Sequence, residues 1–198
     1  MKKLLGVLLV CAFALPAAAG VLPGDKAPDF TLKDTTGQEH QLANYLKEGK
    51  TVVLEWFNPD CPFIVKHHQN HKTMNESYAK VKGHDVVWLA INSGAEGKQG
   101  HGLERNRKAV KDYGIPFPVL LDPSGRVGKA YGAKTTPHMY VITAEGVVAY
   151  SGAIDDDRSA AKLGETNHVL AALHDLMQGN NVQVAETKPY GCSVKYGQ

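Results

Sequence analysis

Two continuous apolar runs dominate the hydrophobic pattern of this 198-residue chain. Residues 51–57, TVVLEWF, and residues 85–92, DVVWLAIN, are rich in β-branched and aromatic side chains that do not alternate with polar ones. Strands that are buried on both faces have this pattern, because neither side of such a strand meets water. We therefore expect two central strands of a sheet that is covered by helices.

Segments with helical spacing connect these strands and continue the alternation. Residues 61–81 carry apolar side chains at roughly helical intervals until Gly83, and they predict one long helix. A charged helix is predicted over residues 103–113, followed by a short strand at 118–122 and a short helix at 127–131. This order predicts parallel strands joined by helical crossovers.

The pattern changes at both ends of the chain. Residues 29–42 predict an early hairpin, and a short helix follows at 43–47. Residues 138–152 predict a second hairpin, and an amphipathic helix closes the pattern at 166–177. Together these elements predict an α/β protein with a central mixed β-sheet flanked by helices, an N-terminal β-hairpin extension and an irregular C-terminal tail. The element order matches the thioredoxin-like fold.

The first 19 residues have the composition of a secretory signal peptide. Two lysines precede an apolar run that ends at Leu15, and three alanines follow as a cleavage site. The run is too short to span a bilayer of about 30 Å. We expect cleavage after Ala19; a lipoprotein signal ending at Cys11 fits less well, because Val10 is large where a small residue is needed.

Cleavage after Ala19 divides the chain into three parts: the signal peptide 1–19, a single folded domain over 20–179 and a tail over 180–198. The 22 basic residues fall to 20 without the leader, equal to the 20 acidic residues. A neutral balance favours neither a nucleic-acid partner nor, after cleavage, a membrane partner. Two cysteines stay, Cys61 and Cys192, and an even pair suits the periplasm or the secreted state.

Cys61 is the strongest chemical candidate, because it stands where a buried strand hands over to a helix. Pro62 suits the first helical position, where a missing amide proton costs nothing. The helix dipole and the free amide groups at this end favour a thiolate, the reactive form of cysteine. A structural cysteine fits the same placement and stays open as an alternative.

Several spaced segments resemble known redox proteins. EWFNPDCPFIVK resembles the active-site segment of the thioredoxin superfamily, and TTPHMYVIT places Pro137 where that superfamily has a cis-proline facing the cysteine. LAINSG, PFPVLLD, VGKAYGAKTTPHMYVI, SGAIDD and KPYGCSVKY resemble the peroxiredoxin-like redoxins of the alkyl hydroperoxide reductase and thiol-specific antioxidant superfamily. The resemblance implies a thioredoxin fold, a redox-active Cys61 and a characteristic late cysteine, Cys192.

Three positions depart from these families. Ile64 stands where thioredoxins have their second cysteine, while Asn58 and Leu54 stand where peroxiredoxins have a Thr or Ser and a proline. Peroxide and disulfide substrates both stay open for this reason. Cys192 is the candidate resolving thiol within the chain, since the tail after residue 179 can span about 43 Å when extended. A Cys61–Cys192 bond that only staples the domain is the structural alternative.

Other polar residues are candidates for proton transfer, for a charge partner of Cys61 or for metal binding. Glu55 lies six residues before Cys61, the offset of a buried acid in thioredoxins, although a strand residue satisfied by a neighbour fits too. His138 adjoins Pro137 and is a candidate base or charge partner. His67 and His71, four residues apart, have a spacing that can hold a metal. The three aspartates at 155–157 favour a solvated loop over a cation site.

These observations predict an exported thiol oxidoreductase that needs no cofactor. Cys61 is the predicted nucleophile, Cys192 resolves the product, and Pro137 shapes the groove. The predicted partners are a thiol or disulfide protein, or a small-molecule peroxide, together with an external thiol reductant. The rival hypothesis is a periplasmic copper-binding or delivery protein in which Cys61 and Cys192 form a structural disulfide.

Overall fold

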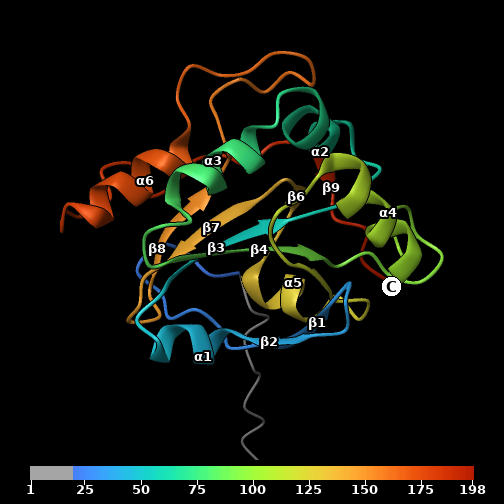
Figure 1. Ribbon diagram of the computed structural model, residues 1–198, viewed down its shortest axis with the longest axis horizontal. Helices are drawn as coiled ribbons and strands as arrows, with labels where there is room; N and C mark the ends of the chain where they lie inside the picture. The colour runs from blue at the N-terminus through green and yellow to red at the C-terminus, as the bar shows by residue number, and fades with distance from the viewer. Residues whose placement is uncertain (1–19) are drawn as a thin grey trace, which may run out of the picture.

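The computed structural model describes residues 20–198, so the predicted signal peptide lies outside the described residues. A seven-stranded mixed sheet crosses the molecule, with helices on both of its faces (Figure 1). Its strand order is β2-β1-β5-β4-β3-β7-β8, in which β3, β4 and β5 are parallel and the other pairs are antiparallel. The strands are β1 (Thr31–Asp34), β2 (Glu39–Gln41), β3 (Thr51–Trp56), β4 (Val86–Asn92), β5 (Val119–Leu121), β7 (Met139–Ile142) and β8 (Val148–Gly152).

Alternate side chains of β3 face two separate cores. Val53 packs into the core under α2, α3, α4 and α6, whereas Leu54 and Trp56 pack into the core under α1 and α5. Neither face of β3 meets water, which is why its sequence is apolar without alternation. The helices are α1 (Leu42–Lys47), α2 (Pro62–Val65), α3 (Thr73–Val81), α4 (Leu103–Tyr113), α5 (Arg126–Tyr131) and α6 (His168–Met177).

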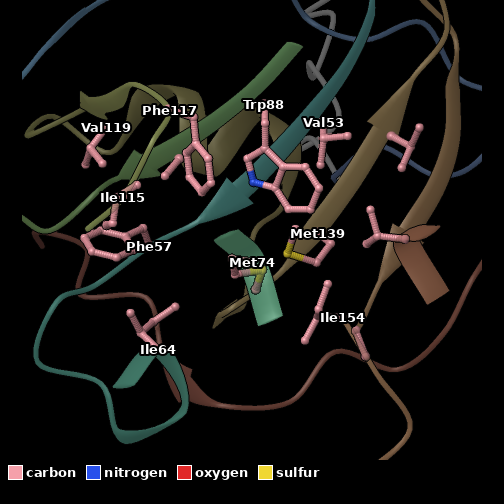
Figure 2. Close-up of a cluster of buried hydrophobic side chains, with 14 of the residues drawn as sticks. Val53, Phe57, Ile64, Met74, Trp88, Ile115, Phe117, Val119, Met139 and Ile154 are labelled. Atoms are coloured by element: carbon pink, nitrogen blue, oxygen red, sulfur yellow. The ribbon is translucent and has the colours of Figure 1, made fainter. Parts of the chain in front are cut away.

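The first of these cores surrounds Trp88 of β4. Figure 2 shows the Trp88 ring between Val53, Phe117 and Met139, with Met74 of α3 on the near side. Figure 2 also shows Phe57 and Ile64, which come from the two sides of the turn that carries Cys61. The segment around Cys61 is thus held by packing against the sheet.

The predicted single helix over 61–81 is wrong. The segment consists of α2, a π-helix η1 (Lys66–Asn70) and α3, and Lys72 between the last two has a left-handed backbone with φ 53°. The His71 N–H binds the Lys66 carbonyl, the bond that defines a π turn. Lys66, His67 and His68 are all fully buried. An α-helix turns about 100° per residue, so a regular α-helix at the surface would expose one of three consecutive residues.

The pattern also missed two strands of two residues each. β6 (Thr135–Thr136) pairs antiparallel with β9 (Cys192–Ser193) in a small second sheet. The C-terminal tail is otherwise irregular, as predicted, and it returns to the part of the molecule where α2 begins (Figure 1). No helix within residues 20–198 is long and apolar enough to cross a membrane.

Truncation of a β3 side chain tests the sheet as the main source of stability. Leu54 is fully buried, so Leu54→Ala is expected to lower the free energy of unfolding by about 2–5 kcal/mol in urea titrations. Leu22 is 56% exposed, and Leu22→Ala serves as the control with little expected change. Equal stabilities of the two variants would contradict the assigned core.

Candidate active site

Cys61 stands where the chain leaves the sheet and enters a helix. It is the N-cap of α2, with Pro62 at the start of that helix. The Cys61 carbonyl accepts the N–H groups of Ile64 and Val65, so the helix begins on this residue. The predicted position at a helix start is found, yet the side chain has no exposed surface.

The loop before Cys61 is fixed by its own hydrogen bonds. The Asn58 side chain accepts the N–H of Asp60 at 3.0 Å and donates to the Gln99 carbonyl at 3.4 Å. The Asp60 carboxylate binds the guanidinium of Arg105 with two N–H groups, at 2.8 and 2.5 Å. Arg105 was not predicted from the sequence. The available signal was Asp60, the acidic residue directly before Cys61.

The peptide bond between Thr136 and Pro137 is cis, as the resemblance implies. The residue before this proline faces the cysteine: the Cys61 thiol donates a hydrogen bond to the Thr136 carbonyl, with 3.0 Å between sulfur and oxygen. Pro137 therefore lies next to the thiol, and a backbone oxygen is the group that contacts the sulfur.

The tail brings Cys192 to the same point. Cys192 pairs with Thr136 across β6 and β9, and the Val194 N–H binds the Lys134 carbonyl at 3.1 Å. Gly191 makes this approach possible, because a Cβ there would lie 2.1 Å from the Thr136 oxygen. Both cysteines are free thiols, and Cys192 packs against the core cluster that contains Cys61.

The environment of Cys192 favours its thiol over its thiolate. Burial, followed by the proximity of the Cys61 side chain, raises the pKa of Cys192 to about 11. Cys192 therefore keeps its proton near neutral pH, while its side chain is half-buried and that of Cys61 is fully buried. The two cysteines thus differ in their access to solvent.

The hydrogen-bond partners of Glu55 include neither cysteine. Its carboxylate binds His68 of η1 at 2.7 Å and accepts the Trp88 indole N–H at 3.5 Å. Both Glu55 and His68 have no exposed surface, and His68 is enclosed by the rings of Phe57, Tyr113 and Phe117. The Glu55 carboxylate is thus paired with His68, which the sequence did not indicate as its partner.

His67 and His71 bind different partners. The ring of His67 is buried and hydrogen-bonds to Thr73 and to Tyr190 of the tail, while His71 contacts the Ala161 carbonyl at 2.9 Å. Within residues 20–198 no group of three His, Cys, Asp or Glu side chains is placed to hold a metal ion. This geometry gives the copper hypothesis no ligand set.

Asp155 and His138 both differ from expectation. Asp155 does not lie in a solvated loop: it is 3% exposed and pairs with Lys66 at 3.7 Å. His138 is buried, and its ring hydrogen-bonds to Ser151, Tyr140 and the Lys134 N–H, with no such bond to Cys61. Burial and the nearby charge of Lys134 lower the pKa of His138 to about 3, so the ring is neutral.

The family model described as the AhpC/TSA family matches residues 23–151. The chain belongs to the AhpC/TSA family. A relative, the thiol-disulfide oxidoreductase ResA of Bacillus subtilis, is 29% identical over 178 residues, which span 82% of this chain and 93% of ResA.

Solved structures agree with this family assignment. The hypothetical protein SMc02350 from Sinorhizobium meliloti 1021 has a TM-score of 0.79 and 30% identity, covering 90% of this chain and 96% of its own. The thioredoxin domain of thiol-disulfide oxidoreductase BVU-2223 from Bacteroides vulgatus has a TM-score of 0.56 at 18% identity, covering 67% and 89%, and shares the fold. The predicted family, the thioredoxin-like fold and the assignment to thiol-based oxidoreductases are confirmed.

Removal of one partner tests the buried Glu55–His68 pair. His68→Phe leaves the carboxylate of Glu55 without its main partner, and it is expected to lower the free energy of unfolding by about 3–5 kcal/mol at neutral pH. The double variant with Glu55→Leu is expected to recover much of that loss in the same urea titrations. A double variant no more stable than His68→Phe would argue against the pairing as the cause.

The buried histidines predict a loss of stability in acid. Burial comes first among the causes that lower the pKa of His67 and of His138 from 6.5 to about 3. Between these values the unfolded chain binds the extra protons, so stability is full above pH 6.5 and falls toward pH 3. The expected slope is about 1.4 kcal/mol per pH unit for each histidine.

Urea titrations of the wild type and of His138→Gln at several pH values between 7 and 4 measure this contribution. The variant is expected to lose less stability over the range, because one of the two histidines whose pKa is lowered to about 3 is gone. Parallel curves for the two proteins would exclude His138 as a source of the acid sensitivity.

Proposed function

We propose that this thiol oxidoreductase cycles between a Cys61–Cys192 dithiol and a disulfide, with a small hydroperoxide as the oxidant. The observation that carries the proposal is the neighbour that the two cysteines share: the Cys61 thiol donates to the Thr136 carbonyl, and Cys192 pairs with Thr136 across β6 and β9. Cys192 reaches Cys61 from β9, which is itself paired with β6. Two free thiols held in this way can be joined without a long movement of the tail.

In the oxidising half of the cycle, the Cys61 thiolate attacks one oxygen of the hydroperoxide. The S–O bond forms as the O–O bond breaks, and the leaving hydroxide or alkoxide takes up a proton. Cys61 is thereby oxidised by two electrons to a sulfenic acid. The sulfur of Cys192 then attacks this group: an S–S bond forms, the S–O bond breaks, and water leaves with the proton of the second thiol.

Access to the sulfur supports a small oxidant. Cys61 has no exposed surface, and the tail lies over it. A disulfide in a folded protein is too bulky to reach Cys61 while β9 is in place, whereas a small molecule needs only a local opening.

Disulfide exchange is the second candidate, and the geometry of Asn58 favours it. Both ends of the Asn58 amide are used within the loop, so this side chain is not free to orient a peroxide as the Thr or Ser of peroxiredoxins does. The relative ResA is named a thiol-disulfide oxidoreductase. In this case a partner dithiol exchanges with the Cys61–Cys192 disulfide.

In the reducing half, an external thiolate attacks the sulfur of Cys192. Cys192 is a partly exposed residue and Cys61 is a buried one, so Cys192 is the more accessible target. Cys61 leaves as a thiolate at the start of α2, where the helix N-terminus favours a negative charge. In this scheme Pro137 holds the Thr136 carbonyl against the thiol.

Export of the protein supports the same chemistry. The signal-peptide pattern of residues 1–19 supports cleavage after Ala19 and a periplasmic or secreted protein, with the domain over 20–179 and the tail over 180–198. Disulfides persist in such a compartment, so the cycle there needs an external thiol reductant. The near-neutral charge of the mature chain supports neither a nucleic-acid nor a membrane partner.

The intact mass of the reduced protein, sampled rapidly after one equivalent of hydrogen peroxide, tests the proposal. The wild type is expected to lose two hydrogens within seconds, while Cys61→Ser stays unchanged and Cys192→Ser gains one oxygen. A wild-type mass that does not change over minutes would exclude the peroxide reaction. Oxidised glutathione added to the same sample then tests disulfide exchange, and the starting mass shows whether the leader was removed.

A further inference from the structure

Tyr190, two residues before Cys192, is the most closely held residue of the tail. It is 5% exposed, and its ring meets Phe63 edge-on at a centroid distance of 5.8 Å. Phe63 lies in α2, two residues after Cys61. A single tail side chain therefore touches the helix that begins at the redox cysteine.

The phenol oxygen of Tyr190 is also the centre of a buried hydrogen-bond network. It lies 3.0 Å from Nε2 of His67 and 3.5 Å from Nζ of Lys66, and it donates its proton to the Asp155 carboxylate. The Lys66 ammonium also donates to two carbonyls of the loop at 157–159, at 2.7 and 3.0 Å. All four side chains are buried, and they come from η1, the loop after β8 and the tail.

The protons of this network can be assigned by counting donors. Burial and the charge of Lys66 lower the pKa of His67 to about 3, so its ring is neutral and carries one N–H. The Tyr190 proton goes to Asp155, so Nε2 of His67 must donate to the phenol oxygen and Nδ1 must accept from the Thr73 hydroxyl. Every polar atom at the centre then has a partner, and the phenol has one position.

We infer that Lys66, His67 and Asp155 form a clasp on Tyr190 that positions Cys192 against Cys61. This inference rests on the proposed redox cycle and adds positioning residues to it. The π turn belongs to the clasp, because it turns Lys66 and His67 inward together. The closed clasp raises the effective concentration of the Cys192 thiol at Cys61. The Cys61–Cys192 disulfide therefore forms faster than a disulfide between Cys61 and another thiol.

A purely structural anchor would make the same contacts but would stabilise the dithiol and the disulfide equally. A positioning role differs in one measurable quantity, the equilibrium between the Cys61–Cys192 pair and glutathione. In that exchange two glutathione thiols are oxidised to one disulfide as the protein disulfide is reduced, so atoms and electrons balance. Its equilibrium constant reports the effective concentration of one thiol at the other.

Tyr190→Phe is the sharpest variant, because it removes the hydroxyl and leaves the ring against Phe63. Equilibration in glutathione buffers, with the oxidised fraction read from intact mass after acid quenching, is expected to show an effective concentration about tenfold lower than in the wild type. This change corresponds to a reduction potential about 30 mV less negative. Lys66→Met, which removes the ammonium that faces the phenol, is expected to shift the equilibrium in the same direction.

Tyr45→Phe is the matched control. It also removes a phenol hydrogen bond, to His40 at 2.5 Å, but α1 lies on the opposite face of the sheet from α2. Its equilibrium constant is expected to equal that of the wild type. Equal constants for Tyr190→Phe, Lys66→Met and the wild type would overturn the clasp, whatever the folding stabilities.

Failure of the clasp and failure of the proposed function give different results. The glutathione equilibrium does not use peroxide, so it tests the clasp even if hydrogen peroxide leaves the wild-type mass unchanged. A wild type that forms no Cys61–Cys192 disulfide in any glutathione buffer would overturn both. A wild type that forms it, with variants that match it, would overturn the clasp alone.

Discussion

The pairing of β9 with β6 is the contact on which the active site depends. β6 has only two residues and lies outside the seven-stranded sheet, so the tail supplies its strand partner. The same pairing places Cys192 opposite Thr136, whose carbonyl accepts the Cys61 thiol. One short backbone contact thus brings Cys192 to the Thr136 carbonyl that accepts the Cys61 thiol.

The fold could be predicted where side-chain spacing reports burial. The central strands β3 and β4 are apolar because both of their faces are covered, and α4 begins and ends at the predicted residues, 103 and 113. The helix over 61–81 could not be predicted, because hydropathy treats Lys66, His67 and His68 as surface residues. They are buried since each finds a partner far away in the sequence: Asp155, Tyr190 and Glu55 respectively.

The candidate site was predictable in part for the same reason. Cys61 and Pro137 lie in local motifs, and local sequence therefore located both. The path of the tail depends instead on Gly191, whose missing side chain allows contact with Thr136, and on the buried partners of Tyr190. Two-residue strands have no periodicity to detect, so the family resemblance and the reach of the tail, rather than a hydrophobic pattern, predict that Cys192 and Cys61 meet.

The position of β9 in the chain has a consequence for how the protein matures. Every strand of the seven-stranded sheet is synthesised before the segment that covers Cys61. A nascent chain can therefore complete its sheet while Cys61 is still uncovered and lacks its thiol neighbour. In that interval the proposed cysteine pair is not yet assembled, and Cys61 is open to any thiol or oxidant that the folding chain meets.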